Sequence, residues 1–391
     1  MPLRILHLHS TFTLGGKEAR AVRLMNAWGP AARHTILSAV PDALAAREAI
    51  APGIAADFPG AAAPPLHGMP GLPRYRRLAA YMAGFDLVLS YNWGAMDGVM
   101  AHRLFARVRR LPPLLHHEDG FNADEAERQK TRRVLFRRAA LPTARALVVP
   151  SQRLERIARQ VWRQPAARVR RIANGIPVAR FAAAPLPGAL PGFERRPGDV
   201  VIGTIAGLRG VKNLPLLVRA FARALDAADM ARARLVIVGE GPERDAIRAA
   251  AADAGVADRL LLPGFVADPA RYAGHFDVFA LSSDSEQFPI SLLEAMAAGL
   301  PVAATAVGDI AHMVSPENRP FLTPPGDAAA LGTALARLVA NRDLRHRLGS
   351  ANRARVEACY SEKAMIEAYR ALYAGAVGRA DALGPPDGPM S

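Results

Sequence analysis

Residues 282–302 read SSDSEQFPISLLEAMAAGLPV, and this stretch decides the fold. An apolar strand pattern over Phe276–Ser282 comes directly before it. A polar loop follows, and then a helical pattern over Ser291–Ala298. A Gly-Leu-Pro sequence ends the helix, and Val302–Thr305 predicts a return to strand. A strand, a loop, a helix and a second strand in this order form one unit of a parallel α/β sheet.

Two glutamates in this stretch, Glu286 and Glu294, stand with seven residues between them. The first lies in the loop, and the second lies about one turn inside the helix. Loop amides and a helix N-terminus can receive anionic and polyhydroxylated groups, and carboxylates accept hydrogen bonds from sugar hydroxyls. The competing interpretation makes both glutamates ordinary surface charges, but apolar residues flank Glu294 on both sides. We therefore interpret the pair as ligand-binding carboxylates.

The alternation of short strands and helices extends outward along the chain in two series. The first series has buried-strand patterns at Arg4–Ser10, Thr35–Val40, Leu87–Ser90, Leu114–His116 and Ala146–Pro150. The second has them at Val200–Ile205, Arg234–Val238, Leu260–Leu262, Phe276–Ser282 and Val302–Thr305. Between the two series, residues 182–199 are rich in Ala, Pro and Gly, which predicts a surface linker.

We therefore expect two Rossmann-like α/β domains that face a central cleft, in which a ligand binds. The expected first domain covers residues 1–181, the linker 182–199 and the second domain 200–361. An amphipathic helix over about 362–378 is expected to cross back to the first domain. The tail 379–391 is rich in Pro and Gly, so we expect it to be disordered.

The composition of the chain indicates its cellular compartment and the charge of its partners. The chain has 391 residues and one cysteine, Cys359, so it cannot form a disulfide framework or a cysteine-based metal site. A reducing cytoplasm is the expected location. The N-terminus has no signal-peptide layout, and no apolar run reaches the roughly 20 residues of a membrane span. The net charge of +15 is concentrated in residues 1–197, which hold 30 Lys and Arg against 13 Asp and Glu, so the first domain should face an anionic partner.

A second motif follows the first strand of the second domain, where residues 203–214 read GTIAGLRGVKNL. Its loop carries Arg209 and Lys212, and two cations at the carboxyl end of a strand suit a departing diphosphate. An exposed basic loop is the alternative interpretation. Gly15 and Gly16 follow the first strand of the chain, where glycine allows a backbone to approach a phosphate closely, although such a pair also forms simple turns.

A polar cluster, residues 115–122, reads LHHEDGFN at the end of another strand. Glu118 and Asp119 are candidates to orient an imidazole or to bind acceptor hydroxyls. Trp93 is a candidate for an acceptor pocket, because an indole joins a large apolar face to a polar N–H group. Two alternatives stay open, a structural cluster that caps a helix through Asp119 or Asn122 and a core position for Trp93. We disfavour metal ligation because the chain has no Asp-x-Asp motif.

With these motifs the chain resembles the retaining glycosyltransferase family 4, whose members have the GT-B fold of two Rossmann domains. The resemblance covers roughly Leu3 to Tyr373 and is most specific in the Glu-x7-Glu block followed by Ala-Met-Ala-x-Gly-x-Pro-Val. It implies that Glu294 binds the ribose of a donor nucleotide and that Glu286 touches the donor sugar beside the bond that breaks. It also implies that no metal or cofactor is needed besides the NDP-sugar, which is a co-substrate.

The resemblance implies roles for further residues. Backbone contacts to sugar or phosphate fall to Gln287, Phe288 and Pro289. The loops around the base contain Gly239, Gly264 and Phe265. The diphosphate contacts fall to Gly15, Gly16, Arg209 and Lys212. Either His116 or His117 lies near the donor sugar and eases its developing positive charge. The family usually has an arginine five residues before the lysine; Gly207 stands at that position here, and Arg209 stands three before.

The sequence thus predicts a hexosyltransferase-type enzyme that moves a sugar from an NDP-sugar to a glycan or lipid-linked acceptor in bacterial surface polysaccharide or glycolipid synthesis. The basic segments Arg74–Arg77, Arg107–Arg110 and Arg128–Arg138 are expected to meet anionic lipid at the cytoplasmic face of the inner membrane, or an acceptor phosphate. A GT-B-related epimerase or phosphorylase is an alternative against which the Glu-x7-Glu block argues. A basic nucleic-acid- or nucleotide-binding protein is the other, although the chain has no recognisable nucleic-acid motif.

Overall fold

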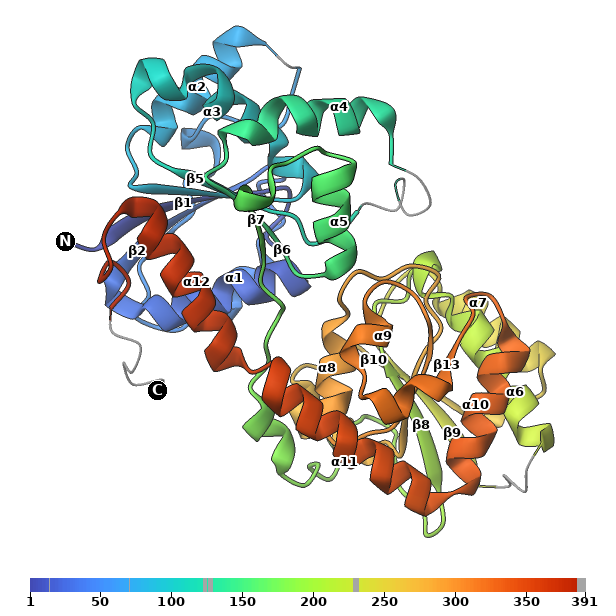
Figure 1. Cartoon of the computed structure of the whole chain (residues 1–391). Coiled ribbons are helices and arrows are strands. Elements are labelled where there is room, and N and C mark those ends of the chain that lie inside the picture. The colour runs from blue at the N-terminus through green and yellow to red at the C-terminus, as the bar shows by residue number, and fades with distance from the viewer. Residues whose placement is uncertain (14, 70, 122–124, 126–128, 228–231, 385–391) are drawn as a thin grey trace. The chain divides into compact units, whose positions relative to one another are not determined.

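The computed structural model describes residues 1–13, 15–69, 71–121, 125, 129–227 and 232–384. The chain forms two compact units (Figure 1). Unit 1 contains Met1–Asn174 together with Lys363–Ser391, and unit 2 contains Gly175–Glu362. Both are parallel α/β units, which confirms the predicted fold class.

The sheet of unit 1 has seven parallel strands in the order β3-β2-β1-β4-β5-β6-β7. The strands are β1 (Leu3–His9), β2 (Ala32–Ser38), β3 (Ala56–Asp57), β4 (Leu87–Tyr91), β5 (Leu114–His117), β6 (Ala146–Val149) and β7 (Val169–Arg171). The helices are α1 (Gly16–Trp28), α2 (Leu72–Met82), α3 (Met96–Arg109), α4 (Thr131–Ala140), α5 (Gln152–Gln160) and α12 (Glu362–Val377).

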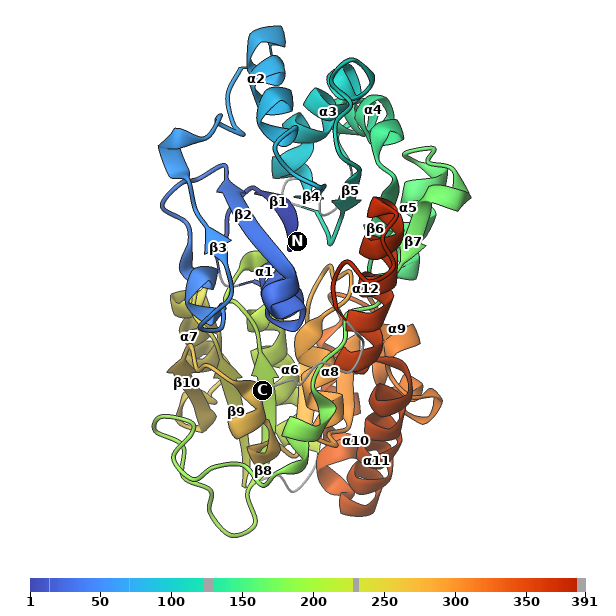
Figure 2. The same cartoon turned by 90° about the vertical axis from the view of Figure 1, so that its left-hand side faces the viewer.

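Two apolar layers bury the two faces of this sheet. Successive side chains of a strand point to opposite faces, so Ile5 of β1 joins a core that contains α1 and α12 residues, whereas Leu6 joins a core that contains residues of α2 to α5. Strands covered on both faces are apolar along nearly their whole length, which explains why the sequence shows them clearly. Figure 2 shows the strands β1 to β3 beside one another, and α12 beside β6 and β7.

The sheet of unit 2 has six parallel strands in the order β10-β9-β8-β11-β12-β13. The strands are β8 (Val200–Ile205), β9 (Ala233–Val238), β10 (Leu260–Gly264), β11 (Val278–Leu281), β12 (Val302–Thr305) and β13 (Leu322–Thr323). The helices are α6 (Leu214–Ala227), α7 (Arg244–Asp253), α8 (Ile290–Ala297), α9 (Ile310–Met313), α10 (Ala328–Ala340) and α11 (Arg342–Cys359). The strand order reverses between β8 and β11, and ligands of open α/β sheets bind where it does so.

The chain passes from unit 1 to unit 2 at Asn174–Gly175, before the expected linker 182–199. It returns to unit 1 at Glu362–Lys363, at the start of the helix that was expected to cross back. Residues 182–199 belong to unit 2, because Leu190 and Phe193 are buried in its core. Its Pro and Gly content predicted a surface linker, but Leu190 and Phe193 hold the segment against unit 2.

The tail that follows α12 is described as far as Gly384, and residues 385–391 of the expected disordered tail lie outside the described residues. Leu383 is buried in the core of unit 1, and Arg370 donates hydrogen bonds to the carbonyls of Leu383 and Gly384, the latter at 2.9 Å. This part of the tail is therefore packed. None of the helices in the described ranges has the length and apolar character needed to cross a bilayer.

Candidate functional site

The polar loops of unit 2 lie at the carboxyl ends of β8 and β11, where the strand order reverses. Hydrogen bonds tie the two loops together. Ser282 Oγ donates to the Lys212 carbonyl oxygen at 2.9 Å, Asn213 Nδ2 donates to Asp284 Oδ1 at 2.9 Å, and the Asp284 amide donates to the Val211 carbonyl oxygen at 2.9 Å. Residues about 70 positions apart in the chain are thus joined in one hydrogen-bonded platform.

Lys212 and Glu286 meet on this platform. The Lys212 ammonium forms an ion pair with Glu286 Oε1, and Ser283 Oγ donates to the same oxygen at 2.8 Å. The two side chains are 15% and 10% exposed, so the pair is largely shielded but reachable from solvent. Lys212 of one motif and Glu286 of the other therefore stand side by side.

Glu294 lies on α8, which begins at Ile290 directly after Pro289. Its helix neighbours Leu292, Leu293, Ala295 and Met296 are fully buried, whereas Glu294 itself is half-buried. Burial and then the Glu294 charge raise the pKa of the Tyr272 hydroxyl, which places this carboxylate close to that ring. The position is a partly shielded carboxylate at the edge of an apolar helix and not a fully solvated charge.

The loop between Glu286 and α8 is held by the loop after β12. A Cβ on Gly308 would lie 2.3 Å from the Glu286 carbonyl oxygen, and Gly308 has φ +60°, so only glycine fits there. The Asp309 amide donates to the Gln287 carbonyl oxygen at 3.3 Å. Phe288 packs edge-on against Tyr360, with ring centroids 5.6 Å apart. The predicted backbone contacts of Gln287, Phe288 and Pro289 therefore fall on a supported loop.

Gly239, directly after β9, and Gly264, the last residue of β10, lie where other groups come close to the backbone. Gly239 has φ +146°, and a Cβ there would lie 1.9 Å from the Ala206 carbonyl oxygen in the loop after β8. The Gly239 amide donates to the Gly264 carbonyl oxygen at 2.9 Å, which joins the loop after β10. Phe265 follows with 63% of its surface exposed, so its ring can receive a planar group.

Arg209 lies in the loop after β8 and is exposed. Its side chain folds back toward Gly207: Arg209 Nε lies 3.5 Å from where a Cβ of residue 207 would be. The Arg209 amide also donates to the Gly207 carbonyl oxygen at 2.8 Å. The Arg209 guanidinium thus lies in van der Waals contact with the position where a side chain at residue 207 would begin.

In unit 1 both histidines of the polar cluster are fully buried. His116 Nδ1 lies 2.9 Å from Ser90 Oγ, and His117 Nε2 lies 2.9 Å from the Tyr373 hydroxyl of α12. Burial lowers the pKa of His117 to about 3, so its ring is neutral. We expected one of these imidazoles to lie near a donor sugar, but neither ring is exposed. The strand β5 extends to His117, so both side chains are buried under the layers that cover the sheet.

The two acidic residues of this cluster have different surroundings. Glu118 is fully buried and accepts a hydrogen bond from Arg137 Nε at 3.2 Å, so it does not face an acceptor. Arg137 in turn stacks on Trp93 and Trp162, with its guanidinium carbon 5.0 and 4.9 Å from the ring centroids. Trp93 is half-buried in this internal cluster. Asn122, the alternative helix cap, lies outside the described residues.

Asp119 joins α1 to the cluster. Arg20 Nη2 donates to Asp119 Oδ2 at 2.8 Å, and Arg20 Nη1 donates to Asn174 Oδ1 at 3.1 Å. Burial favours the neutral form of Asp119, but the Arg20 charge outweighs burial and holds the pKa of this carboxyl below its usual value. The sequence analysis did not identify Arg20, because nothing in the sequence distinguishes it from the other basic residues of its helix.

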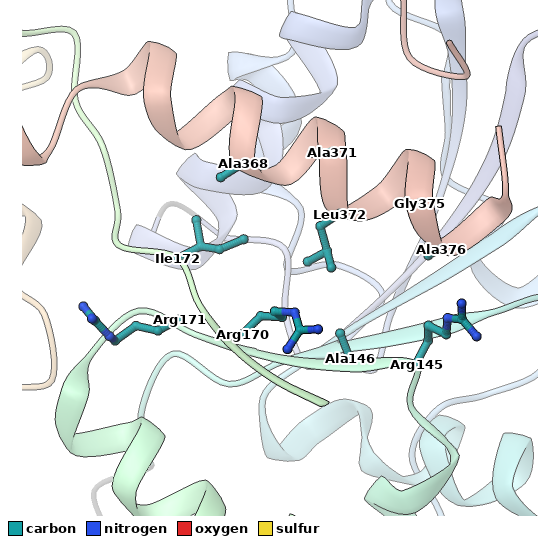
Figure 3. Close-up of a pocket in the computed structure, with 10 residues that line it drawn as sticks. All are labelled: Arg145, Ala146, Arg170, Arg171, Ile172, Ala368, Ala371, Leu372, Gly375 and Ala376. Carbon is teal, nitrogen blue, oxygen red and sulfur yellow. The ribbon is translucent and has the colours of Figure 1, made fainter. Parts of the chain in front are cut away.

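A pocket of about 500 Å³ lies in unit 1 between α12 and the strands β6 and β7 (Figure 3). Arg145 and Arg170 line it opposite the small residues Ala371 and Gly375. None of the residues that the sequence proposed for the site lines it. Across the described ranges, no group of three or more His, Cys, Asp or Glu side chains is placed to hold a metal ion.

Two family descriptions match the chain. "Glycosyltransferase Family 4" matches residues 14–180, and "Glycosyl transferases group 1" matches residues 192–355. A solved structure of Anabaena Alr3699/HepE in complex with UDP superposes with a TM-score of 0.77 at 18% identity, over 95% of this chain and 100% of that one.

Curated relatives match over a shorter length. The N-acetyl-alpha-D-glucosaminyl L-malate synthase of Bacillus anthracis is 29% identical over 169 residues, which are 43% of this chain and 44% of the relative. The GDP-mannose-dependent alpha-(1-6)-phosphatidylinositol monomannoside mannosyltransferase of Mycobacterium tuberculosis is 31% identical over 204 residues, 48% of this chain and 51% of the relative. The chain thus spans about half the length of the curated relatives it matches.

Two parallel Rossmann-like units, with polar loops at the strand-order reversal of unit 2, define the GT-B class of proteins. The chain belongs to the group 1 glycosyltransferases of family 4.

Proposed function

We propose that the protein is a retaining glycosyltransferase whose unit 2 binds an NDP-sugar and whose unit 1 binds the acceptor. The contact between Lys212 and Glu286 at the strand-order reversal carries this proposal, because it joins a phosphate-binding cation to a sugar-binding carboxylate. Glu294 on the following helix takes the ribose hydroxyls. A carboxylate that accepts two hydroxyl hydrogen bonds suits a ribose ring, since charge-assisted hydrogen bonds are stronger than neutral ones.

The proposed reaction replaces one bond at the anomeric carbon. The bond from this carbon to the diphosphate oxygen breaks, and a bond to the acceptor oxygen forms on the same face of the sugar. The acceptor hydroxyl proton moves to the departing diphosphate oxygen. Lys212 and Arg209 stabilise the diphosphate as its charge grows, which lowers the barrier because these cations interact more strongly with the transition state than with the bound donor.

Arg209 takes the part of the arginine that the family usually has at position 207. Its side chain folds back over Gly207, so its guanidinium can reach the same volume from two residues further along the chain. The side chain is exposed, and no ion pair of Arg209 is found among the described residues, so the cation is available to a ligand.

The base and the sugar of the donor stay open among the nucleoside diphosphates. The Anabaena structure contains UDP, whereas the mycobacterial relative is GDP-mannose-dependent. The exposed ring of Phe265 and the packed glycine loops beside it are the proposed surroundings of the base.

The proposal that unit 1 binds the acceptor is based on its charge. Unit 1 contains 30 Lys and Arg against 15 Asp and Glu, whereas unit 2 contains 20 Lys and Arg against 20 Asp and Glu. The helix α3 packs against both α2 and α4 (Figure 1). These three helices expose both apolar side chains and arginines. The exposed apolar residues are Leu72, Leu104, Val108 and Leu135, and the exposed arginines include Arg76, Arg77, Arg103, Arg107 and Arg132. We propose that this face meets anionic lipid and that the acceptor is a glycan or a lipid-linked glycan in cell-surface assembly.

Isothermal titration of UDP, GDP, ADP and their sugar conjugates tests the donor site. The wild type should bind one base selectively, and Glu294→Ala should weaken that binding at least tenfold, because a charged hydrogen-bond acceptor contributes about 1.5–3 kcal/mol. Glu317→Ala, at an exposed position of unit 2, is the matched control and should bind as the wild type does. A folded wild-type protein that binds none of these nucleotides would refute the proposed function.

A further inference from the structure

The pocket between α12 and the strands β6 and β7, here called the α12 pocket, lies apart from every residue that the proposed reaction uses (Figure 3). All of its lining residues belong to unit 1. Two of them, Ala146 and Ile172, join the core that contains α1 and α12 residues, whereas α2, α3 and α4 contribute to the core on the other face of the sheet. The α12 pocket is therefore separate from the basic face of those three helices.

The pocket lies at the edge of the sheet, because β7 is its last strand. Arg170 of β7 pairs with Val148 of β6, and paired residues of neighbouring strands point to the same face, so Arg170 lies on the face that α12 covers. Arg170 and Ile172 on one side and α12 on the other leave a volume of about 500 Å³ between them. This volume is within the range of small-molecule sites, about 300–1,000 Å³.

Two arginines give the pocket a positive charge that no internal carboxylate balances. Arg145 and Arg170 are exposed, and neither forms an ion pair with an acidic residue in the described ranges, whereas Arg171 pairs with Glu155 at 3.1 Å. Figure 3 shows Ala146 between the side chains of Arg145 and Arg170, while Arg171 points away from both. Guanidinium groups bind phosphate through pairs of parallel hydrogen bonds, so these two arginines suit an anionic ligand.

The rest of the lining is apolar. The residues of α12 that line the pocket lie on one face of the helix and are mostly small. They are Ala368, Ala371, Leu372, Gly375 and Ala376. Among the described residues of the lining, none has a carboxylate, hydroxyl or amide side chain that could bind a sugar hydroxyl. A hydroxyl-rich ligand would lose hydrogen bonds to water here, whereas a hydrocarbon chain would gain from leaving water.

We propose that the α12 pocket binds a lipid phosphate, a hydrocarbon chain that ends in a phosphate monoester. The phosphate lies between Arg145 and Arg170, and the chain lies along the small residues of α12. A phosphate monoester has nearly two negative charges at neutral pH, which match two guanidinium groups without an acidic partner. A carboxylate has only one charge and matches them less well. The inference does not rest on the proposed NDP-sugar chemistry.

The test is calorimetric titration of the full chain with n-octyl phosphate, below the concentration at which this amphiphile forms micelles. The wild type should bind it at a single site. Inorganic phosphate, octyl glucoside and octanoate should each bind at least about fivefold more weakly, because they lack the chain, the charge and the second charge, respectively.

Three variants locate the site. Arg145→Gln and Arg170→Gln should each weaken the binding of octyl phosphate roughly tenfold, because each removes a charged hydrogen-bond donor. Ala371→Trp should weaken it as well, because the indole fills the pocket, and the fold should tolerate this change at an exposed position. The exposed Arg33→Gln on β2 is the matched control and should bind as the wild type does.

Inorganic phosphate or octyl glucoside that binds as tightly as octyl phosphate would overturn the inference, because one half of the pocket would then contribute nothing. So would unchanged affinity of folded Arg170→Gln or of folded Ala371→Trp. If the wild type dimerises in ultracentrifugation and Ala371→Trp stays monomeric, the pocket binds a second copy of the chain and the inference also falls. The proposed function fails separately: binding of octyl phosphate without any nucleotide keeps the α12 pocket and refutes the donor assignment.

Discussion

Gly207 stands in the loop after β8 where the family usually has an arginine, and we propose that Arg209 replaces that arginine. Moving the arginine from position 209 to position 207 tests this proposal. Arg209→Ala removes a cation whose Nε lies 3.5 Å from the Cβ position of residue 207. If its guanidinium makes one charge-assisted hydrogen bond to the departing diphosphate, the loss should cost about 1.5–3 kcal/mol in the transition state. That corresponds to a fall in kcat/KM of roughly 10- to 150-fold. Stability should hardly change, because Arg209 is exposed.

The double variant Gly207→Arg with Arg209→Ala decides whether an arginine at position 207 can replace Arg209. Gly207 does not have a positive φ, and the atoms nearest to a Cβ there are Arg209 Nε and, at 4.0 Å, the Glu240 carbonyl oxygen. With Arg209 truncated, an arginine at 207 therefore fits without strain and should restore most of the lost kcat/KM. The assay measures initial rates of NDP release from the donor identified by titration, with an acceptor found by screening glycans and lipid-linked glycans. Arg209→Ala with unchanged kcat/KM, or a double variant no better than the single one, would refute the reasoning.

Two further predictions concern the stability of unit 1, which contains all three tryptophans of the chain and can thus be followed by their fluorescence during urea unfolding. Arg137→Met should destabilise unit 1 by roughly 3–5 kcal/mol, because it leaves the Glu118 carboxylate buried without its cation; a loss below 1 kcal/mol would contradict this. Burial lowers the pKa of His34 to about 4 and that of His117 to about 3, so the unfolded state binds more protons below the ordinary histidine value. Stability should therefore fall as the pH drops from about 6.5 toward 4, by roughly 1.4 kcal/mol per pH unit and histidine, and His117→Gln should make the fall shallower.

The sequence was sufficient for most of the fold, for a physical reason. Strands of a parallel sheet that helices cover on both faces are short apolar runs, and β8 and β12 coincide with the patterns at Val200–Ile205 and Val302–Thr305. The loop position of Glu286 and the helix position of Glu294 were similarly readable, because both follow from local strand and helix patterns. The contact of Glu286 with Lys212, 74 residues away, follows from the strand order, which the motifs imply only through the resemblance.

The polar cluster after Leu115 shows where such reasoning ends. Two consecutive histidines looked like the end of a strand and the start of a polar loop. His117 instead lies in β5, paired with β4 and β6, and its ring nitrogen lies 2.9 Å from the hydroxyl of Tyr373, 256 residues later on α12. Glu118 is likewise buried by Arg137 from α4. A local sequence pattern cannot distinguish polar residues that pair with distant helices from residues that bind a ligand. The distant partner determines whether such a residue is buried and structural or free to bind a ligand.

One arrangement occurs in both units and bears on ligand selectivity. Lys17 in unit 1 and Lys212 in unit 2 each pair with a largely buried carboxylate, Glu18 and Glu286 respectively. Such pairing fixes the position of an ammonium group but partly neutralises it, so a ligand gains from the cation only by outcompeting the internal carboxylate. A singly charged carboxylate ligand gains little in that exchange, whereas a diphosphate brings more charge and more acceptor oxygens. The Lys212–Glu286 pair should therefore favour diphosphates over monoanions more strongly than an unpaired lysine would, and Glu286→Gln should reduce the preference for pyrophosphate over acetate.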